Sequence, residues 1–180
     1  MSDRKRVRTV GPVIHDLEKV LDAHTHLSGS ESGESAENIL DCMDACGVEK
    51  AFIFAPELNV QTSLLTDEHL DDIRTHNDYC ADICSAAPER LLGFCSLNPT
   101  PQLAGGDLER AVDLKIEEAN RCYHELGLRG VGEVVPAHWY ANDPQVVRLW
   151  EALAELGMYV AFHCGNFFDG RESSYWGLGA

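Results

Sequence analysis

Two histidines separated by a single residue stand near the start of the chain. His24 and His26 lie in segment 20–27, which is mainly apolar and therefore favours a short buried strand. Side chains along a strand alternate between its faces, so both imidazoles project from one face, together with Asp22. Two imidazoles at the end of a strand form half of a metal site. The alternative is a pair of partly buried histidines with separate hydrogen-bond partners, and each would then need a polar neighbour of its own.

Two further polar residues stand at the ends of later apolar segments. Glu133 lies near the end of segment 129–135, and His163 ends segment 159–163. The carboxyl ends of parallel strands carry the active site in α/β folds, and three imidazoles with one carboxylate suit a catalytic divalent ion that keeps an open water position. Taken singly, His163 also fits a core histidine bonded to a carbonyl, and Glu133 also fits a partner of Arg129 or a helix cap. The occurrence of all four residues at strand ends favours the metal site.

Local signals place the strands and helices. Five short apolar segments predict strands at residues 20–25, 51–55, 91–96, 129–135 and 159–163. Four amphipathic segments begin at capping residues and stop at glycine or ahead of proline, which predicts helices from Ser35 to Gly47, from Thr66 to before Pro88, from Asp107 to Gly127 and from Asp143 to Gly157. In the fourth strand, alternation places Glu133 on one face with Val131, and Gly132 on the other face, toward a helix.

The regular alternation of strands and helices predicts a parallel sheet with right-handed crossovers. A parallel barrel and an open doubly wound sheet share this local pattern, but no Gly-x-Gly-x-x-Gly motif follows a strand, which weakens the nucleotide-binding version. The 180 residues, 44% of them hydrophobic, suffice for one packed core. We expect a tail over residues 1–18 and a single domain over residues 19–180.

Composition argues against several function classes. Thirty acidic and fourteen basic residues give a formal charge of −16, and such a chain repels nucleic acid and anionic membranes. The seven cysteines are odd in number and the N-terminus lacks the apolar run of a secretory signal, so free thiols and a cytoplasmic location are expected. Cys42 and Cys46, like Cys80 and Cys84, lie four residues apart on predicted helices, where we expect them to pack as small hydrophobic residues.

The motifs together resemble the amidohydrolase superfamily of metal-dependent (β/α)8 TIM barrels, and in particular its amidohydrolase-related group. Asp22-Ala-His-Thr-His resembles the first-strand motif of that family, Gly127-Leu-Arg-Gly-Val-Gly-Glu its fourth-strand segment, and Phe162-His-Cys-Gly its fifth-strand histidine. The resemblance implies that His24, His26 and His163 are metal ligands, and that Glu133 joins them as in those branches that place a bridging carboxylate there. It implies a divalent ion, with zinc expected first and manganese or iron as alternatives.

The resemblance implies a metal-dependent hydrolase, in which metal-activated water attacks a carbonyl or ring carbon of a small molecule. A metal-dependent decarboxylase of the same fold and a non-catalytic half-barrel are the alternatives, and the pair Gly132-Glu133 favours hydrolysis. His138 and Trp139 follow the fourth strand, so we expect them to contact substrate, although ordinary loop packing also fits.

The length of the chain departs from this family pattern. A full barrel takes about 250 residues, whereas this chain stops at Ala180, just past the fifth predicted strand. We therefore expect a barrel truncated after that strand, without the sixth-strand histidine and eighth-strand aspartate of the family, and we assign no catalytic residue. Unpaired outer strands expose backbone hydrogen-bonding groups, which predicts a homo-oligomer.

Overall fold

The computed structural model describes residues 19–29, 32–56, 68–99, 104–134 and 139–163. Strands and helices alternate along this part of the chain, as predicted. The strands are β1 (Val20–His26), β2 (Val48–Phe54), β3 (Leu91–Cys95), β4 (Gly130–Val134) and β5 (Tyr159–Phe162). The helices are α1 (Ala36–Cys46), α2 (Glu68–Ser85), α3 (Leu108–His124) and α4 (Pro144–Leu156).

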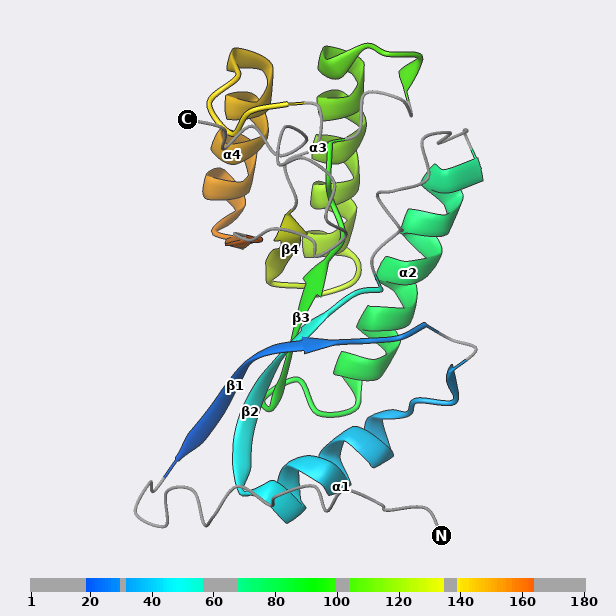
Figure 1. Ribbon diagram of the computed structural model, residues 1–180, viewed down its shortest axis with the longest axis vertical. Coiled ribbons are helices and arrows are strands. Elements are labelled where there is room, and N and C mark those ends of the chain that lie inside the picture. Colours follow the sequence, from blue (N-terminus) through cyan, green and yellow to red (C-terminus); the bar gives the residue numbers. More distant parts are fainter. Residues whose placement is uncertain (1–18, 30–31, 57–67, 100–103, 135–138, 164–180) are drawn as a thin grey trace, which may run out of the picture.

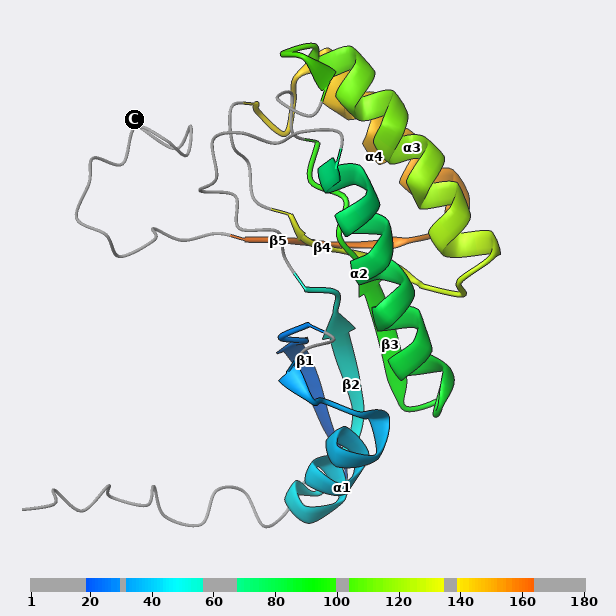
Figure 2. The ribbon, with the colours of Figure 1, turned by 90° about the vertical axis from the view of Figure 1, so that its right-hand side faces the viewer.

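The five strands form one parallel sheet in the order β1-β2-β3-β4-β5, with each strand paired to the next along the chain. The sheet curls, and all four helices lie on its outer side (Figures 1 and 2). The result is a curled half-barrel, which confirms the predicted parallel α/β fold of the TIM-barrel type. Curling matters for function because it turns the carboxyl ends of the strands toward a common centre.

Helix boundaries follow the capping residues of the sequence. Ser35 Oγ accepts a hydrogen bond of 3.2 Å from the Asn38 amide at the start of α1, and Asp107 Oδ1 accepts one of 3.1 Å from the Arg110 amide at the start of α3. Gly47, with φ of 72°, closes α1 in the left-handed conformation. One helix end differs from the sequence prediction, because α3 ends at His124, three residues before the expected glycine. The predicted cap Thr66 lies outside the described residues.

The inner, concave face of the sheet is aromatic. The ring of Phe94 on β3 lies 5.0 Å from that of Phe52 and 4.7 Å from that of Phe54, measured between centroids. A Cβ atom at Gly130 on β4 would overlap the Phe94 ring. The absence of a side chain at Gly130 therefore lets β4 pack against the aromatic residues inside the curve.

Two irregularities in strand register change which face some residues occupy. Asp22 pairs with Ala51 and Thr25 pairs with Ile53, so three steps along β1 match only two along β2. Asp22 therefore shares a face with Thr25, whose hydroxyl donates to its carboxylate at 2.9 Å, while His26 pairs with Phe54. The expectation that Asp22 shares the histidines' face was wrong, because an extra residue in a strand interrupts the alternation of side chains.

A second irregularity lies in β4, between Val131 and Val134. A Cβ atom at Gly132 would meet the Phe54 ring and Ala161 on the concave side, so Gly132 does not face a helix as predicted. Glu133 also faces the concave side, where its carboxylate lies near His26. Simple alternation cannot put two consecutive residues on one face, and the register shift explains why both are found there.

The outer side of the sheet packs against the helices and contains the core. Cys80 and Cys84 on α2 are buried there, as predicted. Cys42 and Cys46 on α1 are exposed, so the prediction that they pack as hydrophobic residues was wrong. Among the described residues, nothing covers that side of α1, and a helical spacing of four fixes a shared face without fixing whether that face is buried. All six cysteines of the described part are free thiols.

One lysine lies inside this outer layer. Lys115 on α3 is 1% exposed, and its Nζ has no hydrogen-bond partner among the described residues. Burial lowers the pKa of Lys115 to about 8, although the nearby Glu118 carboxylate opposes the change. The cationic form of this side chain is therefore a source of instability at neutral pH.

Replacing this lysine should stabilise the protein. We expect Lys115→Met to raise the free energy of unfolding at pH 7 by at most about 3.5 kcal/mol, since one pKa unit corresponds to about 1.4 kcal/mol. The folded pKa of about 8 lies below the ordinary value of 10.5, so between them the unfolded wild-type chain binds more protons and wild-type stability rises with pH. The advantage of the variant is therefore full below pH 8 and lost toward pH 10.5.

Urea unfolding at pH 7 and pH 10 measures this difference. The exposed Lys50→Met is the matched control and should change stability little at either pH. A loss of stability in Lys115→Met at pH 7 would contradict the assignment of a buried, unpaired ammonium.

Candidate metal centre

The four candidate ligands come from three strands, and all stand where these strands end. His24 and His26 lie in the second half of β1, Glu133 is the penultimate residue of β4, and His163 follows the last residue of β5. β1 and β4 are separated by two strands in the sheet. The curl of the sheet therefore brings together residues that a flat sheet would hold more than 10 Å apart, since neighbouring strands are about 4.8 Å apart.

Three donor atoms form the closest group. The Nε2 atoms of His24 and His26 are 2.8 Å apart, and Glu133 Oε2 lies 3.6 Å from the first and 3.4 Å from the second. The three donor atoms all lie within 4.8 Å of one another. Both imidazole rings rest on Phe54, with centroid distances of 4.9 Å for His24 and 5.3 Å for His26. The sequence interpretation did not single out Phe54, although it ends the strand beside the two histidines.

The second oxygen of the carboxylate contacts the fourth candidate. His163 Nδ1 lies 2.6 Å from Glu133 Oε1, and the His163 amide donates to the carbonyl of Val134 at 2.9 Å. Glu133 thus touches His163 through one oxygen and approaches the two β1 histidines through the other. The structure brings all four predicted ligands together, and their shared binding of one ion stays a prediction.

Burial affects the protonation of the site. The pKa of His26 is lowered from its ordinary value, first because burial disfavours the imidazolium and second because His24 stands beside it. Glu133 opposes this change. His26 is therefore neutral at pH 7, and the neutral imidazole is the form that binds a metal ion. The side chain of Glu133 is only 13% exposed, compared with 52% for His24, so the negative charge lies at the protected side of the group.

The spacing and chemistry of these donors fit a divalent cation. Two donors at about 2.1 Å from a tetrahedrally coordinated ion are about 3.4 Å apart, close to the 3.4 and 3.6 Å between Glu133 and the two imidazoles. The 2.8 Å between the imidazoles is shorter, so the rings would separate by a few tenths of an ångström around an ion. Two imidazoles and a carboxylate are common ligands of zinc, manganese and iron.

The predicted substrate contacts lie beside this group in the sequence. His138 falls outside the described residues. Trp139 is 5% exposed and packs 6.2 Å from the ring of Trp150 on α4, measured between centroids. The Trp139 side chain therefore packs against α4, and its contact with substrate stays a prediction.

Comparison with known proteins identifies the family. The amidohydrolase family model matches residues 21–178. The chain belongs to the amidohydrolase family. The match includes all of the predicted ligands, so the resemblance seen in the motifs extends over most of the chain. None of the described helices is long and apolar enough to cross a membrane.

Solved structures share its fold. A 2,6-dihydroxybenzoate decarboxylase from Rhizobium is 22% identical, with a TM-score of 0.58 over 85% of this chain and 52% of its own. A dihydroxybenzoic acid decarboxylase from a Polaromonas species, solved with manganese and the inhibitor 2-nitroresorcinol, is 18% identical, with a TM-score of 0.66 over 85% and 51%. A 5-carboxyvanillate decarboxylase from Sphingomonas paucimobilis is 17% identical, with a TM-score of 0.58 over 81% and 51%. The chain spans about half the length of the solved structures it matches.

Ion binding to this site should weaken in acid. We expect zinc affinity, measured by calorimetry, to be nearly constant from pH 8 to pH 7 and to fall by about 10-fold or more per pH unit below pH 6, because protons compete for the imidazoles. The lowered pKa of His26 keeps this ligand ready at neutral pH. His124→Ala, an exposed histidine on α3, is the control and should show the same profile. An affinity that stays constant down to pH 5 would place the ion elsewhere.

Proposed function

We propose that the chain carries a divalent-metal site at which a small molecule is hydrolysed, with His24, His26, His163 and Glu133 as ion ligands. One observation supports this most directly: the donor atoms of His24, His26 and Glu133 lie within 4.8 Å of one another at the carboxyl ends of their strands. In this proposal His163, bonded to the same carboxylate, completes the set. The position at the strand ends is where barrel enzymes of this type carry their chemistry.

Zinc is the ion that we propose, because nitrogen and carboxylate oxygen ligands in a compact group suit it, and manganese and iron accept the same donors. A bound divalent ion supplies Lewis acidity, which polarises a carbonyl and lowers the pKa of a water molecule. His24 and His26 contribute neutral nitrogen donors, and Glu133 contributes a negative charge that offsets part of the charge of the cation. The Phe54 ring contacts both imidazole rings and shields from water the ring faces that are turned toward it.

The proposal that a small molecule binds at this site follows from the solvent exposure of the donor group. Half of the His24 side chain is exposed, so a small molecule can approach the donors from solvent. His138 and Trp139 are the residues that we propose for substrate contact. The charge of −16 disfavours nucleic acid as a substrate.

The location and assembly of the chain are also part of the proposal. Free thiols at all six described cysteines fit a cytoplasmic protein, and assembly into a homo-oligomer stays a prediction.

Decarboxylation is the second candidate, and the solved structures favour it. The three structures described above are decarboxylases of aromatic acids, one of them with manganese. The same donors would then hold an ion that orients a carboxylate substrate and offsets the negative charge that develops as carbon dioxide leaves. Glu133 after Gly132 supports hydrolysis in our proposal, because it adds a carboxylate directly to the ion site.

Substitution of the proposed ligands tests the site. Calorimetric titration with zinc should show one ion per wild-type chain, and His24→Ala, His26→Ala and Glu133→Gln should each weaken binding by at least about 10-fold, the smallest loss typical even for residues that only support a ligand. His124→Ala and Glu49→Gln, which lie away from the site, should bind as the wild type does. If His24→Ala binds zinc as tightly as the wild type, or if the wild type binds no zinc, the proposed function is contradicted.

Two small probes separate the two chemistries on the zinc- and manganese-loaded chain. Acetohydroxamate resembles the carbonyl group of a hydrolase substrate, whereas 2-nitroresorcinol is the inhibitor bound to the manganese-containing decarboxylase. Hydrolysis predicts that acetohydroxamate binds more tightly and that binding is lost in His26→Ala. If 2-nitroresorcinol, followed by its absorbance, binds more tightly instead and its binding is lost in His26→Ala, the site is assigned to decarboxylation.

A further inference from the structure

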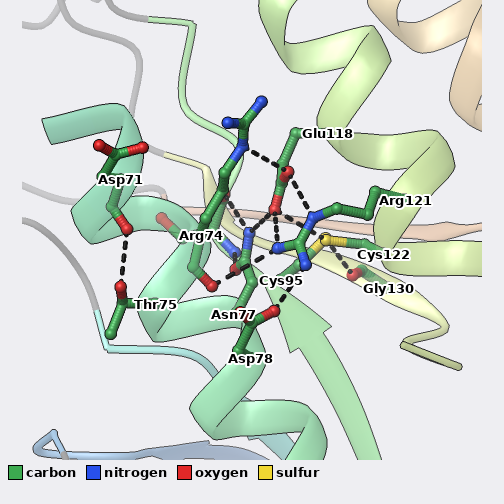
Figure 3. Close-up of polar contacts among 11 residues, drawn as sticks. Asp71, Arg74, Thr75, Asn77, Asp78, Cys95, Glu118, Arg121, Cys122 and Gly130 are labelled. Atoms are coloured by element: carbon green, nitrogen blue, oxygen red, sulfur yellow. Dashed lines mark hydrogen bonds and ion pairs between the residues drawn. The ribbon is translucent and has the colours of Figure 1, made fainter. Parts of the chain in front are cut away.

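A buried polar network joins α2, α3 and the end of β3 in the helical layer (Figure 3). Its centre is Glu118, which is 3% exposed. Arg121 donates to both carboxylate oxygens, from Nε at 2.9 Å and from Nη2 at 2.7 Å, and Asn77 Nδ2 donates at 2.9 Å. Burial by itself raises the pKa of Glu118, but the bonds from Arg121 and Asn77 outweigh it and the pKa is lowered. The carboxylate is therefore ionised and well satisfied.

Asn77 extends this network to the backbone of β3. Its side chain is fully buried, and its Oδ1 accepts a hydrogen bond of 2.8 Å from the Ser96 amide, while Nδ2 lies 3.4 Å from the Ser96 carbonyl oxygen. Ser96 directly follows β3, beyond the last residue paired with β4, Cys95. Buried backbone groups require partners, so the amide of Asn77 replaces a neighbouring strand. Glu118 accepts hydrogen bonds only, which fixes the orientation of that amide.

The same strand end contacts the strand that carries Glu133. Asn98, two residues after Ser96, donates from Nδ2 to the carbonyl oxygen of Glu133 at 3.4 Å. Cys95 Sγ lies 3.3 Å from the carbonyl oxygen of Gly130, at the start of β4. Backbone pairing between β3 and β4 covers only two residue pairs. The contacts of Asn98 and Cys95 therefore extend the connection between the two strands as far as Glu133.

We propose that Asn77 is a positioning residue for the metal site, an inference that rests on the proposed function. Held by Glu118 and Arg121, Asn77 fixes Ser96, and the fixed end of β3 places Asn98 against Glu133. The carboxylate of Glu133 needs such support, because β4 is irregular in register with β5 between Val131 and Val134. A buried ionic network is seldom more stabilising than apolar packing, and this role gives a reason for its presence behind the site.

Metal affinity and the spectrum of bound cobalt test the inference. Cobalt(II) binds sites of this kind and its visible spectrum reports coordination geometry. We expect Asn77→Ala to weaken cobalt binding by about 10- to 100-fold, as supporting residues of metal ligands do, and to change the spectrum. Ile83→Ala, a truncation of a buried residue on the same helix outside the network, should leave affinity within twofold and the spectrum unchanged. Equal effects of the two variants would reduce Asn77 to a structural role.

A double-mutant cycle asks whether Asn77 acts through Glu133. In the Glu133→Gln background, Asn77→Ala should weaken cobalt binding by less than twofold, because the carboxylate that it positions is already gone. If the two substitutions instead act independently, so that their fold-losses of cobalt affinity multiply in the double variant, the inference is overturned. If Asn77→Ala does not fold, Asn98→Ala removes the last contact of the series while leaving the buried network intact, and the same affinity loss and the same cycle are expected for it.

Amide hydrogen exchange without metal separates failure of this inference from failure of the proposed function. We expect Asn77→Ala to speed exchange in residues 130–134 more than Ile83→Ala does. A wild-type chain that binds no cobalt removes the proposed function and with it the positioning role, even if exchange responds as expected. A wild-type chain that binds cobalt through His24, with no response of affinity or exchange to Asn77→Ala, removes the positioning role alone.

Discussion

The packing of two aromatic rings inside the curled sheet is the contact on which the candidate site depends. Phe54 and Phe94 lie 4.7 Å apart between centroids, and β4 approaches them with glycine at the two positions, Gly130 and Gly132, where a side chain would overlap a ring or a neighbour. This close approach brings Glu133 to within 3.6 Å of the imidazoles that rest on Phe54. Apolar packing thus sets the distance between the polar groups of the site.

Buried polar groups lie on both sides of the sheet, and they differ in their hydrogen-bond partners and in their access to solvent. In the helical layer, Glu118 is ionised and held by several donors, while Lys115 close by has no hydrogen-bond partner among the described residues. On the concave side, Glu133 is the only carboxylate of the close donor group, and the two β1 histidines beside it stay partly exposed. The helical layer thus encloses its charged groups, whereas the concave side leaves the imidazole donors of His24 and His26 accessible to solvent, as a binding site requires.

Family membership and geometry bear on different parts of the functional question. The family match covers residues 21–178 and establishes membership of the amidohydrolase family, while solved structures of 22% identity or less establish only the fold. The chain spans about half of their length, so the activity of a complete barrel is a proposal for this protein. What the geometry adds is a compact set of donors drawn from β1 and β4, with His163 of the β5 end against the same carboxylate.

Local patterns in the sequence determined the order of strands and helices, the caps at Ser35 and Asp107, and the ligand types at the strand ends, because these depend on residue period and on neighbours within a few positions. The faces of Asp22 and Gly132 and the exposure of Cys42 were predicted wrongly. Register is set by pairing with another strand, and burial is set by what the fold lays against a surface. The contacts of Glu133 with His24 and of Asn77 with Ser96 join distant parts of the chain. Only the tertiary structure decided them, because no local signal specifies which buried polar groups will meet once the sheet has curled.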